Sequence, residues 1–298
     1  MADIEPNWEW YRSFMAVLET GSLSAAGRAL GMTQPTVGRH VDSLEAALQL
    51  KLFTRSFDGF TPTDAALELK PYASNLAATA AALRRVASSQ GGGARGTVRL
   101  TASEIVSIEV LPPILANLRD AHPELVVELV PSNKVENLLR RDADIAVRMV
   151  APSQDALVAR RVAAIDVGLH AHRRYLERHG TPKSVEDLAR HALIGWDTET
   201  AYIRRFQERF PAITRERFAF RTDSDVAQLA AIRAGLGIGL CQARLAGRDP
   251  AMVRLFKSSV SLTLETWIAM HADLRDSPRC AVTFAALAEG LAAYARGA

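Results

Sequence analysis

Three polar side chains near residue 36 have the types and spacing needed to read base pairs in the major groove of DNA. Gln34 offers a paired hydrogen-bond donor and acceptor that matches adenine, and Arg39 offers a guanidinium group that matches guanine or a phosphate. Thr36 adds a hydroxyl group, and the start of a helix adds backbone N–H groups, which suit phosphate oxygens. A three-helix bundle whose polar side chains face only water stays open as the alternative.

Apolar spacing places these side chains on a helix. The expected buried face is formed by residues at i, i+4, i+7 and i+11, namely Val37, Val41, Leu44 and Leu48. This face turns Arg39 outward. A second helix is expected over 23–30, after a glycine stop and a serine cap, and a Gly-Met turn separates it from the helix that begins near Gln34. The spacing predicts a helix-turn-helix.

The segment after these helices predicts a β-hairpin. Asp58 and Gly59 form a turn signal that is flanked by aromatic and β-branched residues. Arg55 would lie at the base of this hairpin, within reach of a phosphate or the minor groove. An ordinary solvated hairpin, in which Arg55 contacts only water, is the alternative.

A long helix is expected from Thr63 to about Ala87. Its heptad seam consists of Leu69, Tyr72, Leu76, Thr79, Leu83 and Val86. An exposed helix with such a seam needs a partner, so we expect two identical chains to pair along it. Packing of the seam onto its own N-terminal domain remains the other interpretation.

Length and composition restrict the possible classes of protein. The chain has 298 residues, of which 48% are hydrophobic, enough for two or three globular domains. Two widely separated cysteines, with no secretion signal and no long apolar run, favour a cytoplasmic protein. The formal net charge is +3, and residues 1–95 carry nine basic and nine acidic side chains. DNA affinity would therefore depend on a few placed contacts rather than on a general basic surface.

A glycine-rich segment around residues 91–93 marks a hinge, and the pattern changes after it. Strand-like runs then alternate with helical stretches, which predicts an α/β domain with largely parallel strands and twin subdomains around a cleft. Expected strands cover 97–102, 125–130, 144–149, 162–171, 192–195, 218–222, 238–240 and 266–271, and expected helices cover 106–121, 135–141, 224–234 and 278–294.

The order of residues in the first part of the chain resembles that of the LysR-type transcriptional regulators. The matching stretches include FMAVLETGSLSAA (14–26), ALGMTQPTVGRHV (29–41), LFTR (52–55) and TPTDA (61–65). Weaker matches follow at 96–103, 111–113, 122–125, 142–146 and 234–240. The resemblance implies a fold that is α/β overall: an N-terminal all-α winged helix-turn-helix domain, a long linker helix, and a C-terminal two-subdomain α/β effector domain resembling periplasmic binding proteins.

This family pattern assigns a range to each domain. The winged helix-turn-helix domain covers 1–63, the linker (dimerisation) helix 64–90, and the effector-binding domain 91–298, with subdomain I at about 97–161 and 270–298 and subdomain II at about 162–269. The resemblance also adds Thr33 and Pro35 to the DNA-contacting residues. At two positions the chain departs from the family: Gly38 stands where a serine is usual, and Ala66 where a glycine is usual.

In the implied architecture a small molecule binds between the subdomains, at strand ends and helix N-termini. The family's position equivalent to Ser103 commonly contacts the effector. We expect an effector site formed by Ser103, Glu104, Asn133, Arg148, Trp196, Asp197 and Thr222. Ser103 and Asn133 could instead be helix caps, and Arg148 could instead form a structural ion pair. The charge of the effector stays open.

These observations together predict a sequence-specific DNA-binding transcriptional regulator that responds to a small-molecule effector. Expected partners are double-stranded promoter or operator DNA, a second copy of the chain through the linker helix, and further copies in a homotetramer, with RNA polymerase as a possible partner. No catalytic constellation, metal site or cofactor motif is expected. A cytoplasmic solute-binding protein and an α/β enzyme are the alternatives.

Overall fold

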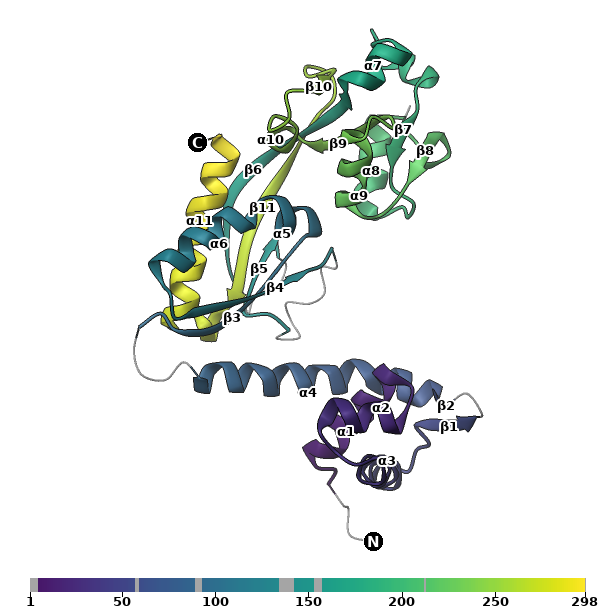
Figure 1. Ribbon diagram of the computed structural model, residues 1–298, viewed down its shortest axis with the longest axis vertical. Helices are drawn as coiled ribbons and strands as arrows, with labels where there is room; N and C mark the ends of the chain where they lie inside the picture. Colours follow the sequence, from purple (N-terminus) through teal and green to yellow (C-terminus); the bar gives the residue numbers. More distant parts are fainter. Residues whose placement is uncertain are drawn as a thin grey trace. The chain divides into compact units, whose positions relative to one another are not determined.

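The computed structural model describes residues 5–56, 59–88, 93–133, 142–152, 157–211 and 213–297 (Figure 1). It contains two compact units, an N-terminal unit that extends to Ala87 and a C-terminal unit that begins at Ser88. The helix expected over 135–141 and the turn residue Asp58 lie outside the described residues. No described helix has both the length and the apolar composition of a membrane span.

The N-terminal unit has the helix-turn-helix and hairpin that the sequence predicts. Gly21 ends the first helix in the left-handed conformation, and the Ser22 side chain accepts a hydrogen bond from the Ala25 N–H at the start of the second. Its elements are α1 (Trp8–Thr20), α2 (Leu23–Leu30), α3 (Gln34–Leu48), β1 (Phe53–Ser56), β2 (Gly59–Pro62) and α4 (Asp64–Ser88).

A small core holds these helices and the hairpin together. It includes Phe14, Val17, Ala26, Val37, Val41, Leu44, Leu52 and Phe53. The hairpin is fixed to the turn between α1 and α2, because the Phe60 N–H donates to the Gly21 carbonyl at 3.0 Å. Gly59 makes this approach possible: its φ is +121°, and a Cβ there would lie 2.8 Å from the same carbonyl oxygen.

Helix α4 uses different faces for two purposes. Ala66 and Ala73 are buried against the N-terminal core, and Leu69 of the expected seam packs there as well. The other large apolar residues of the seam are exposed, with 70% of Tyr72 and 67% of Leu83 open to solvent. Packing within the chain therefore holds for the first position of the seam, and pairing of two chains along its exposed residues stays a prediction.

The C-terminal unit contains a mixed sheet. Its strands are β3 (Gly96–Ala102), β4 (Leu125–Pro131), β5 (Ile145–Arg148), β6 (Leu157–His172), β7 (Leu193–Gly195), β8 (Phe218–Arg221), β9 (Ile238–Gln242), β10 (Met252–Leu255) and β11 (Ser261–His271). The order is β4-β3-β5-β11-β6-β9-β7-β8, and β10 pairs with β6. Strands β4, β3 and β5 run parallel, as do β8, β7 and β9.

The expectation of a largely parallel sheet is wrong for the strands that join these two parallel groups. Strand β11 pairs antiparallel with both β5 and β6, and β6 pairs antiparallel with β9 and β10. Both β6 and β11 begin five residues before their expected starts at 162 and 266. The early parts of these strands are partly exposed and carry polar residues, so they lack the apolar run that marks a buried strand. The subdomain boundaries expected near 161 and 269 fall inside β6 and β11.

The helices of this unit are α5 (Glu104–Glu109), α6 (Leu111–Ala121), α7 (Arg173–His179), α8 (Ala201–Arg209), α9 (Asp225–Arg233), α10 (Ala243–Ala246) and α11 (Pro278–Arg296). Short 3₁₀ helices cover Glu186–Arg190, Arg215–Arg217 and Ala272–Leu274. The single helix expected over 106–121 is divided at Val110. Pro112 and Pro113 explain this break, because each lacks an N–H and its ring crowds the preceding turn.

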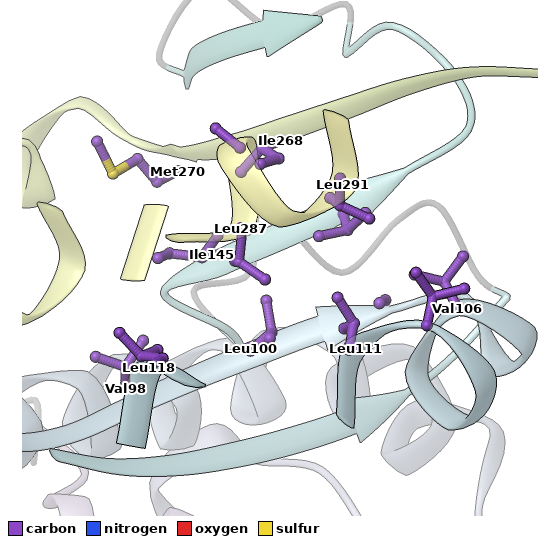
Figure 2. Close-up of a cluster of buried hydrophobic side chains, with 14 of the residues drawn as sticks. Val98, Leu100, Val106, Leu111, Leu118, Ile145, Ile268, Met270, Leu287 and Leu291 are labelled. Carbon is purple, nitrogen blue, oxygen red and sulfur yellow. The ribbon is translucent and has the colours of Figure 1, made fainter. Parts of the chain in front are cut away.

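Two large hydrophobic cores, together with smaller clusters, stabilise the described part of the C-terminal unit. Figure 2 shows side chains of the first core converging from β3, α5, α6, β5, β11 and α11, among them Leu100, Leu111 and Leu287. The second core includes Tyr175, Trp196, Phe206 and Phe218. Leu229 of α9 and Leu245 of α10 belong to the first core although their neighbouring strand β9 pairs beside β7. The two halves of the sheet are therefore packed together through α9 and α10.

Candidate DNA-binding and effector sites

The first turn of α3 presents its polar residues to solvent. Thr33, Gln34 and Pro35 are exposed, and Thr36 is half-buried. Thr33 is the N-cap residue by backbone geometry, but its side chain makes no cap hydrogen bond. Instead its hydroxyl lies 2.9 Å from the Thr36 hydroxyl. The helix start thus offers a pair of hydroxyl groups beside the positive end of the helix dipole, an arrangement that suits a phosphate.

Arg39 lies on the same side of the helix, one turn further on. Its side chain is exposed, and no ion pair to it occurs within the described ranges. The buried positions of α3 are Val37, Val41, Leu44 and Glu45, so the predicted apolar face is confirmed except that Leu48 is only half-buried. This face directs Arg39 away from the core.

Gln34 is held by a neighbouring helix. The Ser24 hydroxyl of α2 donates to Gln34 Oε1 at 2.8 Å. Gly38, where the family usually has serine, has space for a side chain, because a Cβ would lie 3.5 Å from Leu23 Cδ1, an ordinary contact. Arg55 lies in β1, where its backbone pairs with Phe60 across the hairpin. The side chain of Arg55 lies outside the described part of the chain.

Glu45 fixes the start of the hairpin, a role that sequence reasoning missed. Its Oε1 accepts hydrogen bonds from the Leu52 N–H at 2.8 Å and the Phe53 N–H at 3.2 Å, and its Oε2 contacts Lys51 Nζ at 2.6 Å. Burial by itself would raise the pKa of Glu45, but these hydrogen bonds outweigh it and lower the pKa below its ordinary value. The only signal in the sequence is a glutamate within an otherwise apolar helical face.

Four of the expected effector residues come together at one edge of the sheet. Strands β4, β3 and β5 are parallel neighbours, so their carboxyl ends lie side by side. The Glu104 N–H donates to Asn133 Oδ1 at 3.0 Å. Ser103 begins α5 without a side-chain cap bond, and its Oγ is buried with no hydrogen-bond partner among the described residues.

Arg148 lies at the end of β5 and is almost completely buried. Its guanidinium donates to the Val147 carbonyl and to the Thr101 hydroxyl, each at 3.0 Å. Burial lowers the pKa of Arg148, although an arginine stays protonated at any ordinary pH. The side chain therefore contributes a fixed positive charge beneath this edge.

The other expected effector residues follow β7 and β8. The Thr222 N–H donates to the Gly195 carbonyl, and the Asp197 N–H donates to Asp223 Oδ1. Asp197 Oδ1 also contacts Arg215 Nη2 at 2.6 Å. The bonds place Thr222 and Asp197 at adjacent strand ends, as parallel pairing of β7 with β8 requires.

Trp196 also follows β7, but its side chain is buried. Only 7% of its surface is exposed, and its indole ring meets the rings of Phe206 and Phe218 edge to face. The structure gives this side chain a packing role in the second core. Its indole Nε1 is buried with no hydrogen-bond partner among the described residues, and the expected effector contact of Trp196 stays a prediction.

One side-chain bond joins the two groups of expected effector residues. The Ser224 hydroxyl, at the cap of α9, donates to Glu104 Oε2 at 2.9 Å across 120 sequence positions. At the other end of α5, Glu109 forms an ion pair with Arg233 at 2.6 Å and with Arg248 at 3.6 Å. The hydrogen bond from Arg233 lowers the pKa of Glu109. Helix α5 is therefore bonded to α9 at both of its ends.

A second carboxylate, that of Asp225, lies close to Glu104. Burial and the Glu104 charge raise the pKa of Asp225 from 3.8 to about 6. Asp225 was not predicted from the sequence, because the charge close to it, that of Glu104, belongs to α5, more than a hundred residues earlier in the chain. This group of residues is polar and partly buried, with negative charge at Glu104 and Asp225 and positive charge at Arg148.

Within the described ranges, no group of three or more His, Cys, Asp and Glu residues is placed to hold a metal ion. Burial raises the pKa of the Cys241 thiol to about 12, so it stays protonated near neutral pH.

Family models match both parts of the chain. Residues 8–67 match the model described as "Bacterial regulatory helix-turn-helix protein, lysR family", and residues 91–292 match the "LysR substrate binding domain". The transcriptional regulator CrgA of Neisseria meningitidis serogroup C is 28% identical over 193 residues, which cover 65% of this chain and 64% of CrgA. The activator AaeR of Escherichia coli is 27% identical over 179 residues, 60% of this chain and 58% of AaeR. The chain thus aligns with just over half to two thirds of the length of such relatives.

Solved structures with similar folds cover nearly the whole chain. The full-length virulence activator AphB of Vibrio cholerae has a TM-score of 0.62 at 21% identity, with 94% of this chain and 98% of AphB covered. CbnR, a LysR family transcriptional regulator, has a TM-score of 0.70 at 20% identity, with 96% and 99% covered. The two family models together span most of the residues, and the chain belongs to the LysR family of bacterial helix-turn-helix regulators.

Proposed function

We propose that this protein is a sequence-specific DNA-binding transcriptional regulator whose activity responds to a small-molecule effector. The observation that carries this proposal is the start of α3, where Gln34 and Pro35 of the first turn and Arg39 of the second turn are exposed beside an uncapped helix start. Exposed donors on the second helix of a helix-turn-helix are suited to the major groove. CbnR, which shares the fold, has been solved with its target DNA.

The linker helix supports a second part of this proposal, the pairing of two chains. Its exposed apolar residues are Leu67, Tyr72, Leu76, Leu83 and Val86. Burial of such residues against a second copy would remove a large apolar surface from water. A dimer presents two recognition helices, which multiplies a modest affinity per half-site, and further pairing gives a tetramer.

The effector site is proposed at the strand ends of the C-terminal unit. One group, at the carboxyl ends of β3, β4 and β5, consists of Ser103, Glu104, Asn133 and Arg148. The other group, at the carboxyl ends of β7 and β8, consists of Asp197 and Thr222. The Ser224–Glu104 bond couples the two groups, so a ligand there would act on both halves of the sheet. We infer that such a ligand shifts how the two halves are arranged and thereby how dimers associate on DNA. A regulator of this kind acts in the cytoplasm, where its promoter DNA lies.

Binding of the full-length protein to the DNA upstream of its own gene tests the proposal. We expect a specific complex in a gel-shift assay, and we expect Arg39→Ala to weaken it by about tenfold to a hundredfold, because one good base contact contributes that much discrimination. Arg119→Ala is the matched control, since Arg119 is an exposed arginine on α6 of the other unit.

Two results would contradict the proposal. One is the absence of any specific complex, with and without a metabolite extract, which would favour a solute-binding protein or an enzyme. The other is an Arg39→Ala variant that binds the upstream DNA as tightly as the Arg119→Ala variant does.

A further inference from the structure

The contact between Ser24 and Gln34 joins the two helices of the helix-turn-helix at the point proposed to meet DNA. Ser24 Oγ lies 2.8 Å from Gln34 Oε1, and both residues are at least partly exposed. A serine hydroxyl supplies one proton, and the amide oxygen accepts it. No other side-chain hydrogen bond involves Gln34 within the described ranges. Ser24 is therefore in a position to set the orientation of the Gln34 amide.

The backbone around this contact holds the two helices at a fixed separation. Gly27 of α2 is buried, and a Cβ there would lie 2.8 Å from the Met32 carbonyl oxygen. The Met32 N–H also donates to the Gly27 carbonyl at 2.8 Å. Since Gly27 of α2 packs against the backbone of the turn that leads into α3, Ser24 cannot move far from Gln34 without breaking this turn. The Ser24 hydroxyl therefore keeps a fixed position relative to the Gln34 amide and is not a mobile surface group.

The orientation of the amide decides which base edge Gln34 can read. A free glutamine can present its oxygen and its nitrogen together, which matches the N7 acceptor and N6 donor of adenine. When Oε1 is held towards α2 by the Ser24 proton, Nε2 keeps both of its hydrogens for an outside acceptor. Acceptors on the major-groove edge are N7 and O6 of guanine, N7 of adenine and O4 of thymine.

We propose that Ser24 is a positioning residue that fixes Gln34 as a hydrogen-bond donor to a base acceptor and thereby sets the base preference at one position of the operator. The inference rests on the proposed function, since it requires α3 to enter the major groove. It goes further by naming a residue of the preceding helix that determines specificity without supplying the base contact. It also replaces the adenine pairing expected from the sequence with donation to an acceptor edge.

Selection from a randomised duplex library by the full-length protein tests this role. The proteins compared are the wild type, Ser24→Ala, Ser24→Thr, Gln34→Ala and the double variant Ser24→Ala/Gln34→Ala. The base pair whose preference disappears in Gln34→Ala identifies the position that Gln34 reads. At that position we expect Ser24→Ala to lose about three- to tenfold of the discrimination, the contribution of one hydrogen bond, and Ser24→Thr to keep it.

The double variant separates positioning from a direct contact. If Ser24 acts through Gln34, removal of its hydroxyl has no further effect in the Gln34→Ala background. If Ser24 contacts a phosphate itself, Ser24→Ala weakens binding to every sequence, and equally in both backgrounds, and the proposal is wrong. Melting temperatures confirm folding, because alanine has a higher helix propensity than serine and does not disturb α2.

A modified operator tests the donor assignment when the selected base is a purine. Replacement of that base by its 7-deaza analogue removes the N7 acceptor and leaves the exocyclic group. We expect the wild type to lose binding about three- to tenfold, and Gln34→Ala to show no loss. When the selected base is thymine, deoxycytidine with a guanine partner provides the equivalent test, because it replaces the O4 acceptor by an amino donor.

Two further outcomes of the selection separate the proposed function from the role of Ser24. A wild-type protein that selects no sequence refutes the proposed function and this inference together. A wild type that selects a sequence while Ser24→Ala keeps the full preference at the Gln34 position leaves the proposed function intact and refutes the role of Ser24.

Discussion

The two units of this protein build their recognition surfaces in different ways. In the N-terminal unit the candidate DNA contacts from Thr33 to Arg39 lie within seven consecutive positions of one helix, and their side chains face water. In the C-terminal unit the two groups of candidate effector residues are linked by the Ser224–Glu104 bond, which spans 120 positions, and Arg148 and Trp196 are buried. A surface read by a rigid partner can be local, whereas a site that responds to a small molecule must connect parts that are able to move.

Disruption of the exposed seam on α4 should have the largest effect on DNA binding. Leu83→Glu places a charge on the seam, so we expect dimers to dissociate and operator affinity to fall by about a hundredfold or more, the contribution of a second linked site. The monomer should stay folded, since Leu83 is 67% exposed within the chain. Sedimentation velocity and gel shift measure the two effects.

Arg84→Glu is the matched control, because the adjacent exposed position carries the same new side chain outside the seam. Equal dissociation in both variants, or none in Leu83→Glu, would show that the seam is not the dimer interface.

Substitution of Glu45 tests whether the N-terminal unit, which carries the exposed surface of α3, depends on a buried hydrogen-bond acceptor. In Glu45→Ala the N–H groups of Leu52 and Phe53 lose their acceptor, so we expect the N-terminal unit to lose about 2–4 kcal/mol of unfolding free energy. The pKa of Glu45 is lowered in the fold, so this stabilisation is present above pH 4.5 and is lost as the pH falls below that value. Chemical denaturation followed by circular dichroism measures it.

Glu68→Ala serves as the comparison for Glu45→Ala, since Glu68 is exposed on α4. If the two variants unfold at the same denaturant concentration, Glu45 does not support the hairpin.

The pKa of Asp225 tests whether residues of the candidate effector site lie together in the folded protein. Its pKa is raised, so the folded state keeps a proton that the unfolded state releases near pH 3.8, and the unfolding free energy falls as the pH rises from about 4 to about 6. Asp225→Asn removes this penalty and should stabilise the C-terminal unit by about 1–3 kcal/mol at pH 7. The gain should disappear below pH 4, as thermal unfolding at several pH values will show.

The neighbouring Asp223 provides a control of opposite sign. Hydrogen bonds from Thr198 and Asp197 lower its pKa, so Asp223→Asn should not stabilise the protein at pH 7. Stabilisation by both substitutions would indicate a general charge effect rather than the burial of Asp225 and its repulsion with Glu104.

The smallest expected effect concerns Gly38 in α3. Its Cβ position is free of clashes, so Gly38→Ala should stabilise the N-terminal unit by about 0.5–1 kcal/mol through helix propensity alone. Differential scanning calorimetry measures the change. A loss of stability would mean that α3 needs its glycine for contact with α2.

Sequence patterns predicted the N-terminal unit almost completely. The bounds of α2 agree with the predicted 23–30, and α4 begins and ends within one residue of its expected limits. Caps, glycine stops and apolar spacing act within a few residues of each other, so they can be read without knowledge of the fold. In the C-terminal unit the same reasoning found most strands but missed β10, the early parts of β6 and β11, the helices α7, α8 and α10, and the division of α5 from α6.

The candidate effector site shows what sequence cannot supply. The parallel strand ends that carry Ser103, Asn133 and Arg148 were predictable, because each follows a recognisable strand. The packing of Trp196 between two phenylalanine rings, and the raised pKa of Asp225 beside Glu104, depend on which segments meet. The topology of the whole sheet decides which segments come into contact.

By itself, the sequence determined the family, the order of the elements in the N-terminal unit and the exposed first turn of α3, because these depend on short-range spacing and backbone preferences. Only the tertiary structure decided that Ser24 holds Gln34, that Glu45 supports the hairpin, and that Ser224 and Glu104 link the two halves of the sheet. A hydrogen bond depends on distance and direction in space, and residues far apart in the chain acquire these only when the core has packed.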